Sequence, residues 1–80
     1  MTVRMPTEDI VELAGQSGVE DAEVLQRYLL ACPGAAVEWS ACEHLHAAVL
    51  QVLLAAKPSV RGMPSNAFLR AHIGPLIGAP

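Results

Sequence analysis

The first part of the chain alternates between short apolar runs and polar breaks. Residues 10–14 form a short run rich in β-branched and apolar side chains, and Gly15 ends it, which predicts a strand. Residues 3–5 are expected to pair with this strand across residues 6–9, because Pro6 and Asp9 favour a turn. The chain is therefore expected to open with two paired strands.

A helical period follows this pair. Ser17 and Glu20 match a capping box, in which the Ser17 hydroxyl accepts from the amide of residue 20 and the Glu20 carboxylate reaches back to the amide of residue 17. Apolar positions then recur at the spacing of an amphipathic helix, namely Ala22, Leu25, Leu29 and Cys32. Residues 33–34, Pro-Gly, are expected to stop this helix.

The middle of the chain predicts a strand followed by a buried helix. Residues 36–42 place Val37 and Trp39 at alternate positions, a pattern typical of a strand buried on at least one face. Residues 46–57 are rich in Ala and Leu, and Gln51 is their only polar interior residue. A helix that is apolar all round is buried on more than one side, and Pro58 is expected to end it.

The last part of the chain repeats the order of strand and helix. Residues 59–63 predict a weak strand. Residues 66–73 predict a helix that turns Phe68, Leu69 and Ile73 inward and that residues 74–75, Gly-Pro, break.

These elements predict one α/β domain spanning residues 1–80. The order is β-α-β-α-β-α with an extra N-terminal strand, and helical crossovers between strands imply parallel neighbours. The expected architecture is a mostly parallel sheet of three or four strands with helices mainly on one face. Because the strands are short and rich in alanine, an all-helical bundle is the alternative.

The composition points to apolar surface that a partner covers. The chain is 52% hydrophobic and 16% charged, whereas a typical domain has about 25% charged residues. Too few polar groups then remain to cover a small domain, so some apolar surface is expected to meet a partner or a second copy. The alternative is that the 13 alanines raise the apolar count without adding bulk.

Charge and cysteine content narrow the function classes. The net charge is −3, and no stripe of Lys or Arg could track phosphates, so no nucleic-acid partner is expected. Cys32 and Cys42 form no closely spaced pair, which fits a reducing cytosol. Residues 1–6 lack the apolar core of a signal peptide, and the apolar run 52–56 is too short to span a bilayer. A cytoplasmic protein without membrane insertion is expected.

Residues 37–56, VEWSACEHLHAAVLQVLLAA, carry a family likeness. They resemble the central strand, loop and second helix of the STAS family, which includes bacterial anti-sigma-factor antagonists and cytosolic domains of sulphate transporters. That family's pattern is a strand with an acidic residue, then Asp-Ser-Ser/Thr-Gly opening an apolar helix. Glu38 falls at the strand acid and His46 at the loop Asp, while Ala47 and Ala48 replace the hydroxyl pair and Val49 the Gly. The resemblance, which includes the upstream strand ending in Gly15, covers residues 10–73.

The resemblance implies a protein-interaction module of a bacterial regulatory or signalling system. Its docking surface would lie on the loop 43–48 and the start of the second helix, with His44, Leu45, His46, Ala47 and Ala48 as the partner-binding residues. The implied partner is a histidine-kinase-like anti-sigma factor or another signalling or transport subunit. Because Ala47 and Ala48 carry no hydroxyl group, phosphorylation of the usual serine is chemically impossible here.

Two other function classes remain open at the level of sequence. Cys42, His44 and His46 are residue types that bind zinc, so a small metal-binding or redox-sensing protein is one alternative. A bend between strand and helix would be needed to gather them, because His44 points away from the other two in a helix. A homodimeric structural subunit is the other alternative. No catalytic residues, cofactor or bound metal are expected, since nothing in the sequence supplies an oxyanion hole or a substrate pocket.

Overall fold

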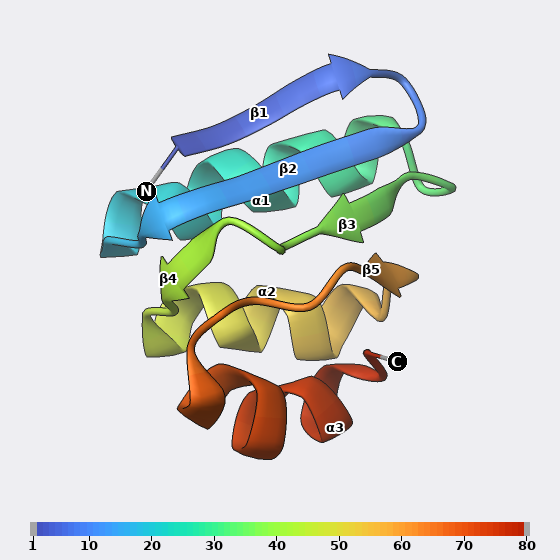
Figure 1. Cartoon of the computed structure of the whole chain (residues 1–80). Helices are drawn as coiled ribbons and strands as arrows, with labels where there is room; N and C mark the ends of the chain where they lie inside the picture. Colours follow the sequence, from blue (N-terminus) through green and yellow to red (C-terminus); the bar gives the residue numbers. More distant parts are fainter. Residues whose placement is uncertain (1, 80) are drawn as a thin grey trace.

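The computed structural model describes residues 2–79 and shows the expected α/β class, with a mixed sheet and three helical segments (Figure 1). The strands are β1 (Thr2–Thr7), β2 (Ile10–Gln16), β3 (Ala36–Glu38), β4 (Cys42–His44) and β5 (Val60–Arg61). The helices are α1 (Val19–Ala31), α2 (Ala47–Ala56), the π-helix η1 (Leu69–Ile73) and α3 (Gly74–Ile77), which continues η1.

The sheet runs in the order β1-β2-β3-β5. β1 and β2 form the expected antiparallel pair, with Val3 opposite Leu13. The pairs β2–β3 and β3–β5 are parallel, with Val37 of β3 opposite Val11 on one side and Val60 on the other. Each parallel pair is joined through a helix, as parallel strands require. The expected pairing of the first two strands and the parallel direction of strands joined through helices are thus confirmed.

The predicted single strand over residues 36–42 is wrong in one respect, because it is interrupted. β3 ends at Glu38, and β4 begins at Cys42 and pairs separately with the far end of β2, Gly15 opposite Cys42. The Glu38 carboxylate accepts hydrogen bonds from the backbone N–H of Ser40, at 2.7 Å, and from its hydroxyl. This local side-chain to backbone bond competes with the ladder and turns the chain out of the strand.

Trp39 lies in this interruption and fills the centre of the core. Its side chain is 1% exposed, and the indole Nε1–H donates to the carbonyl oxygen of Gly62 at 3.0 Å. The core around it collects buried apolar residues from every layer: Val11, Leu13, Leu25, Leu29, Val37, Val49, Leu53, Val60, Leu69 and Ile77. The interruption therefore moves a large aromatic residue into the core and satisfies its polar atom at the same time.

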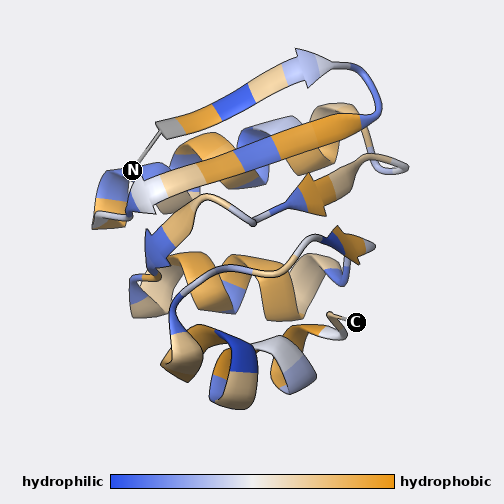
Figure 2. Cartoon of the chain, viewed as in Figure 1, coloured by the Kyte–Doolittle hydropathy of each residue, from blue (hydrophilic) through white to orange (hydrophobic). Residues whose placement is uncertain are grey.

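The helices lie on one face of the sheet. Figure 1 shows α1 and α2 side by side behind the strands, with α3 next to α2 on the side away from α1. Polar residues alternate with apolar residues along β1 and β2 (Figure 2), and successive residues of a strand point to opposite faces of the sheet. Arg4, Glu12, Glu38 and Arg61 lie in lateral register across β1, β2, β3 and β5, and Arg4 pairs with Glu12. A row of charges keeps this face compatible with water.

The start of α1 differs from the expected one, whereas its end does not. α1 begins after Gly18, whose N–H donates to the Asp21 carboxylate at 2.7 Å, so the capping box predicted on Ser17 and Glu20 is wrong. Gly18 and Asp21 provide the cap one residue later. At the other end of α1 the predicted stop is confirmed, since the helix ends at Ala31 just before the Pro-Gly pair.

The Gly-Pro pair does not break the last helix. The π-turn lets the Gly74 N–H donate to the Leu69 carbonyl oxygen five residues back, and Pro75, which has no N–H, occupies the first turn of α3, where no donor is required. Phe68 was expected to point inward but is 61% exposed. Its ring instead packs in a tilted arrangement against the His72 ring one turn later, with centroids 5.1 Å apart, while Leu69 takes the buried position.

Candidate functional site

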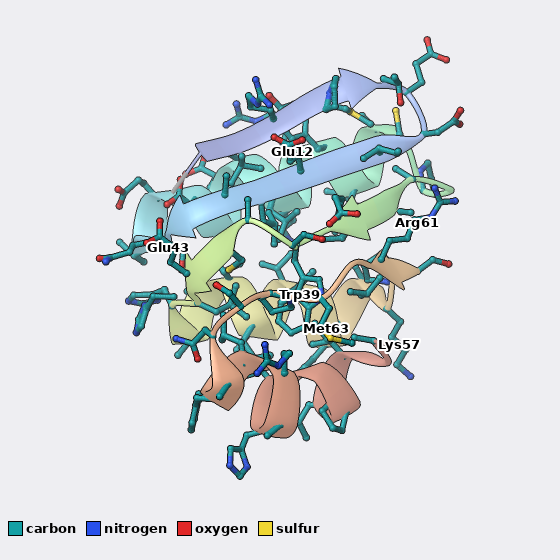
Figure 3. All side chains as sticks on the ribbon, viewed as in Figure 1. Glu12, Trp39, Glu43, Lys57, Arg61 and Met63 are labelled. Carbon is teal, nitrogen blue, oxygen red and sulfur yellow. The ribbon has the colours of Figure 1, made fainter. Side chains whose placement is uncertain are left out.

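The predicted docking residues lie together at the N-terminal end of α2. They occupy the end of β4, the following loop and the first turn of α2: His44, Leu45, His46, Ala47 and Ala48. His44 and Ala47 are exposed, and the other three are half-buried. Glu43, beside them on β4, marks this end of the sheet in Figure 3. The structure therefore presents these five residues as one short surface of exposed and half-buried positions.

His46 is the N-cap of α2. Its backbone is extended, and its ring nitrogen Nδ1 accepts a hydrogen bond from the Ala48 N–H at 3.0 Å. A side-chain acceptor at this position satisfies one of the amide groups that a helix leaves unpaired at its start. The cap requires a lone pair on Nδ1, so the other ring nitrogen is the one free to meet a partner.

Ser17 fastens the loop from the side of β2 and α1. Its hydroxyl accepts a hydrogen bond from the His46 backbone N–H and donates to the His44 carbonyl oxygen at 3.2 Å. The Ser17 backbone N–H donates to the same carbonyl at 3.1 Å. A hydroxyl group that the sequence lacks at Ala47 and Ala48 is thus supplied at the start of α2 by a distant segment of the chain.

Asn66 fastens the same loop from the opposite side. Its side-chain N–H group donates to the Glu43 carbonyl oxygen at 3.2 Å, and its side-chain oxygen accepts from the Leu69 N–H at 3.1 Å. One residue therefore caps the last helix and holds the loop. Together, Ser17 and Asn66 tie residues 43–46 to two segments that are far away in the sequence.

Sequence reasoning missed both of these supports. Ser17 was assigned to a local capping box, although its hydroxyl acts across 29 residues. Asn66, just before an apolar run, has the signature of an N-cap, but nothing in the sequence reveals its bond to Glu43. Contacts between distant segments leave no local pattern to detect.

Cys42, His44 and His46 do not come together as a metal site. Within residues 2–79, no three His, Cys, Asp or Glu side chains are placed to hold one metal ion. The Cys42 thiol is buried and donates to the His44 carbonyl oxygen at 3.7 Å, and the His46 ring caps α2. The geometry gives the metal-binding alternative no support.

Burial also removes Cys42 from nucleophilic chemistry. Desolvation by burial, with a smaller contribution from the nearby Glu43 carboxylate, raises the pKa of its thiol to about 11, although the hydrogen bond to the His44 backbone lowers it. The reactive form of cysteine is the thiolate, which is scarce at neutral pH with such a pKa. Cys42 and the neighbouring histidines therefore do not form an activated nucleophile–base pair.

Glu38 falls at the acidic strand position of the family pattern, and its carboxylate makes contacts within this chain. Besides the bonds to Ser40, it closely approaches Gly62, which adopts a φ of 90°. A Cβ atom on residue 62 would clash with both Glu38 Oε1 and Ser40 Oγ. A glycine is required here, since it permits both the left-handed backbone and the close approach.

No family model, curated protein or solved structure matches this chain. The resemblance to the STAS family consequently rests on the residues quoted above. Over residues 2–79, no helix combines the length and the apolar character that crossing a bilayer demands.

Proposed function

We propose that this chain is a non-catalytic protein-binding module of a bacterial regulatory or signalling system, similar to an anti-sigma-factor antagonist. Its partner would be an anti-sigma factor of the kinase-like type or another signalling or transport subunit. The contact surface is the β4–α2 surface, defined here as residues 44–48. The proposal rests on one observation: this neutral surface is held in place by side chains from two distant segments.

The way the β4–α2 surface is held supports a binding role. Binding is weakened when a loop must be ordered on contact. Ser17 and Asn66 already fix the backbone of residues 43–46 through hydrogen bonds, so little further ordering would be needed. Ala47 is exposed and has no long side chain, which allows a partner backbone to approach α2 closely.

The chemistry of the β4–α2 surface favours recognition over catalysis. His46 is engaged as a helix cap and Cys42 is buried with a raised pKa. Neither therefore supplies an activated nucleophile or a free general base. Because Ala47 and Ala48 lack hydroxyl groups, binding is not controlled by phosphorylation at these two positions.

The experiment compares two alanine-to-glutamate variants in binding to a purified partner. The partner is first captured from the native host, then purified, and its affinity is measured by calorimetry. Ala47→Glu adds bulk and charge to the surface, yet a carboxylate is compatible with the first turn of a helix. Ala71→Glu, on exposed η1, is the matched control. We expect Ala47→Glu to weaken binding by at least about 2 kcal/mol, as at a central interface position.

Equal affinity of wild type and Ala47→Glu contradicts the assignment of this surface. If only Ala71→Glu loses binding, the interface lies on the last helix and not on the β4–α2 surface. Circular dichroism of both variants ensures that a loss of affinity does not come from unfolding.

A further inference from the structure

An apolar groove separates the end of α2 from α3, far from the β4–α2 surface. It has a volume of about 400 Å³, within the range of about 300–1,000 Å³ that is typical of small-ligand sites. Leu53 and Leu54 form one wall, and Leu76 and Ile77 form the other. Leu54 and Leu76 are large apolar side chains left exposed, at 40% and 59%. The groove thus offers apolar surface that the described part of the chain does not cover.

Lys57 is the only ionisable residue that lines this groove. Its side chain has no hydrogen bond or ion pair with any residue of the described range 2–79. Figure 3 shows this side chain leaving the end of α2 on the side of α3. The groove therefore has apolar walls and a single positively charged residue at its edge, which complements a ligand with an apolar chain and a negative end.

The backbone conformation of Lys57 provides a way to test the role of its side chain. Lys57 ends α2 in the left-handed conformation, with φ 50° and ψ 50°, and no other non-glycine residue in the described range has a positive φ. Glycine normally occupies this position, since a Cβ atom makes the conformation unfavourable. Glycine at position 57 would therefore remove the ammonium group without a cost to the backbone.

We propose that this groove binds an aliphatic monocarboxylate, a medium-chain fatty-acid anion, with the alkyl chain between α2 and α3 and the carboxylate on the Lys57 ammonium. A methylene group occupies about the volume of a water molecule, ~30 Å³, so the groove holds on the order of ten carbon atoms. It has room for one alkyl chain, which excludes a two-chain lipid. One unpaired cation among apolar walls complements one carboxylate on an alkyl chain.

Titration calorimetry with octanoate and 1-octanol tests the two halves of this recognition. The two compounds share the same chain length and differ in the charged end. We expect octanoate to bind one-to-one and octanol to bind at least about tenfold more weakly. Decanoate should bind more tightly than octanoate, by roughly three- to fourfold for each methylene group that the groove buries.

Variants at residue 57 separate the effect of the ammonium charge on binding from the effect of the left-handed backbone on stability. Lys57→Gly removes the ammonium group and relieves the left-handed strain, so the melting temperature should rise while octanoate affinity falls at least about tenfold. Lys57→Arg keeps the charge and should retain binding. Arg27→Gln, which removes an exposed cation on α1, controls for net charge and should bind octanoate as the wild type does.

Three results overturn the proposal. They are an absence of octanoate binding at millimolar concentration, equal binding of octanol and octanoate, and unchanged octanoate affinity in Lys57→Gly. Sedimentation of the same samples tests whether a second copy of the chain occupies the groove instead, which would be a further contrary result. A dimer that octanoate does not disturb and that Leu76→Glu dissociates assigns the groove to a second copy of the chain and excludes the carboxylate.

Discussion

The hydroxyl of Ser17 accepts a hydrogen bond from the backbone N–H of His46, a residue 29 positions further along the chain. Ser17 lies between β2 and α1, and His46 is the N-cap of α2. One side chain therefore joins the segment that opens the first helix to the segment that opens the second. The position of the β4–α2 surface depends on this bond, and the following predictions start from it.

Replacing Ser17 by alanine should destabilise the fold. The variant removes a half-buried hydroxyl that accepts from His46 and donates to His44, and a lost hydrogen bond of this kind costs about 1–2 kcal/mol. Urea unfolding followed by circular dichroism measures the change. Ser65→Ala is the control, because the exposed Ser65 side chain has no hydrogen-bond partner in the described chain. If both variants unfold at the wild-type urea concentration, the Ser17 bond contributes nothing.

His46 should be replaceable by asparagine but not by alanine. Asparagine keeps an acceptor for the Ala48 N–H, whereas alanine leaves that amide without its cap, at a cost of about 1 kcal/mol. Thermal unfolding of His46→Asn and His46→Ala compares the two on the same backbone. An equal loss in both variants would show that the His46 ring stabilises the protein by packing and not as a cap.

Cys42 should make the fold sensitive to alkaline pH. The ordinary thiol pKa of 9.0 is raised to about 11 in the folded chain, so the unfolded state loses the proton first. The stabilising contribution is fully present below pH 9 and disappears as the pH rises to about 11, up to roughly 2 kcal/mol. Unfolding free energies of wild type and Cys42→Ala, measured between pH 8 and 11, isolate this contribution by their difference. A difference that stays constant over this range contradicts it.

Gly62 should tolerate no side chain. Alanine at this position would combine a φ of 90° with a Cβ atom that clashes with Glu38 Oε1 and Ser40 Oγ, at a cost of about 2 kcal/mol or more. At Gly34, by contrast, a Cβ atom meets nothing within 4 Å, so Gly34→Ala should be neutral or slightly stabilising. Denaturant unfolding compares the stabilities of Gly62→Ala and Gly34→Ala. Comparable stabilities would mean that the Glu38–Ser40 turn shifts to accommodate the added Cβ atom.

Local patterns in the sequence predicted α1, α2 and the first two strands because each depends on its own residues. The expected helix over 46–57 became α2, Ala47–Ala56, with His46 as its cap. Periodicity reports which face of an element is buried, and the apolar rows of β2 and α1 were long enough to read. The parallel direction of strands followed from these elements and from the rule that helical connections join parallel strands.

The details that sequence did not predict depend on contacts between distant segments or on backbone geometry. The break after β3 exists because Glu38 binds Ser40 and because Trp39 reaches the Gly62 carbonyl, 23 residues away. The last helix continues past Pro75 because a π-turn precedes it, and no residue pattern indicates that turn. Likewise, the five docking residues could be selected by position in the sequence, whereas the supports from Ser17 and Asn66 required the folded chain.

Hydrogen exchange of the chain with and without its purified partner tests the central claim most directly, since it maps contacts at single amides. We expect the partner to slow exchange at residues 44–48 and to leave the open sheet face around Glu12 and Arg61 unchanged. Slower exchange on that sheet face, with residues 44–48 unaffected, would contradict the role proposed for the β4–α2 surface.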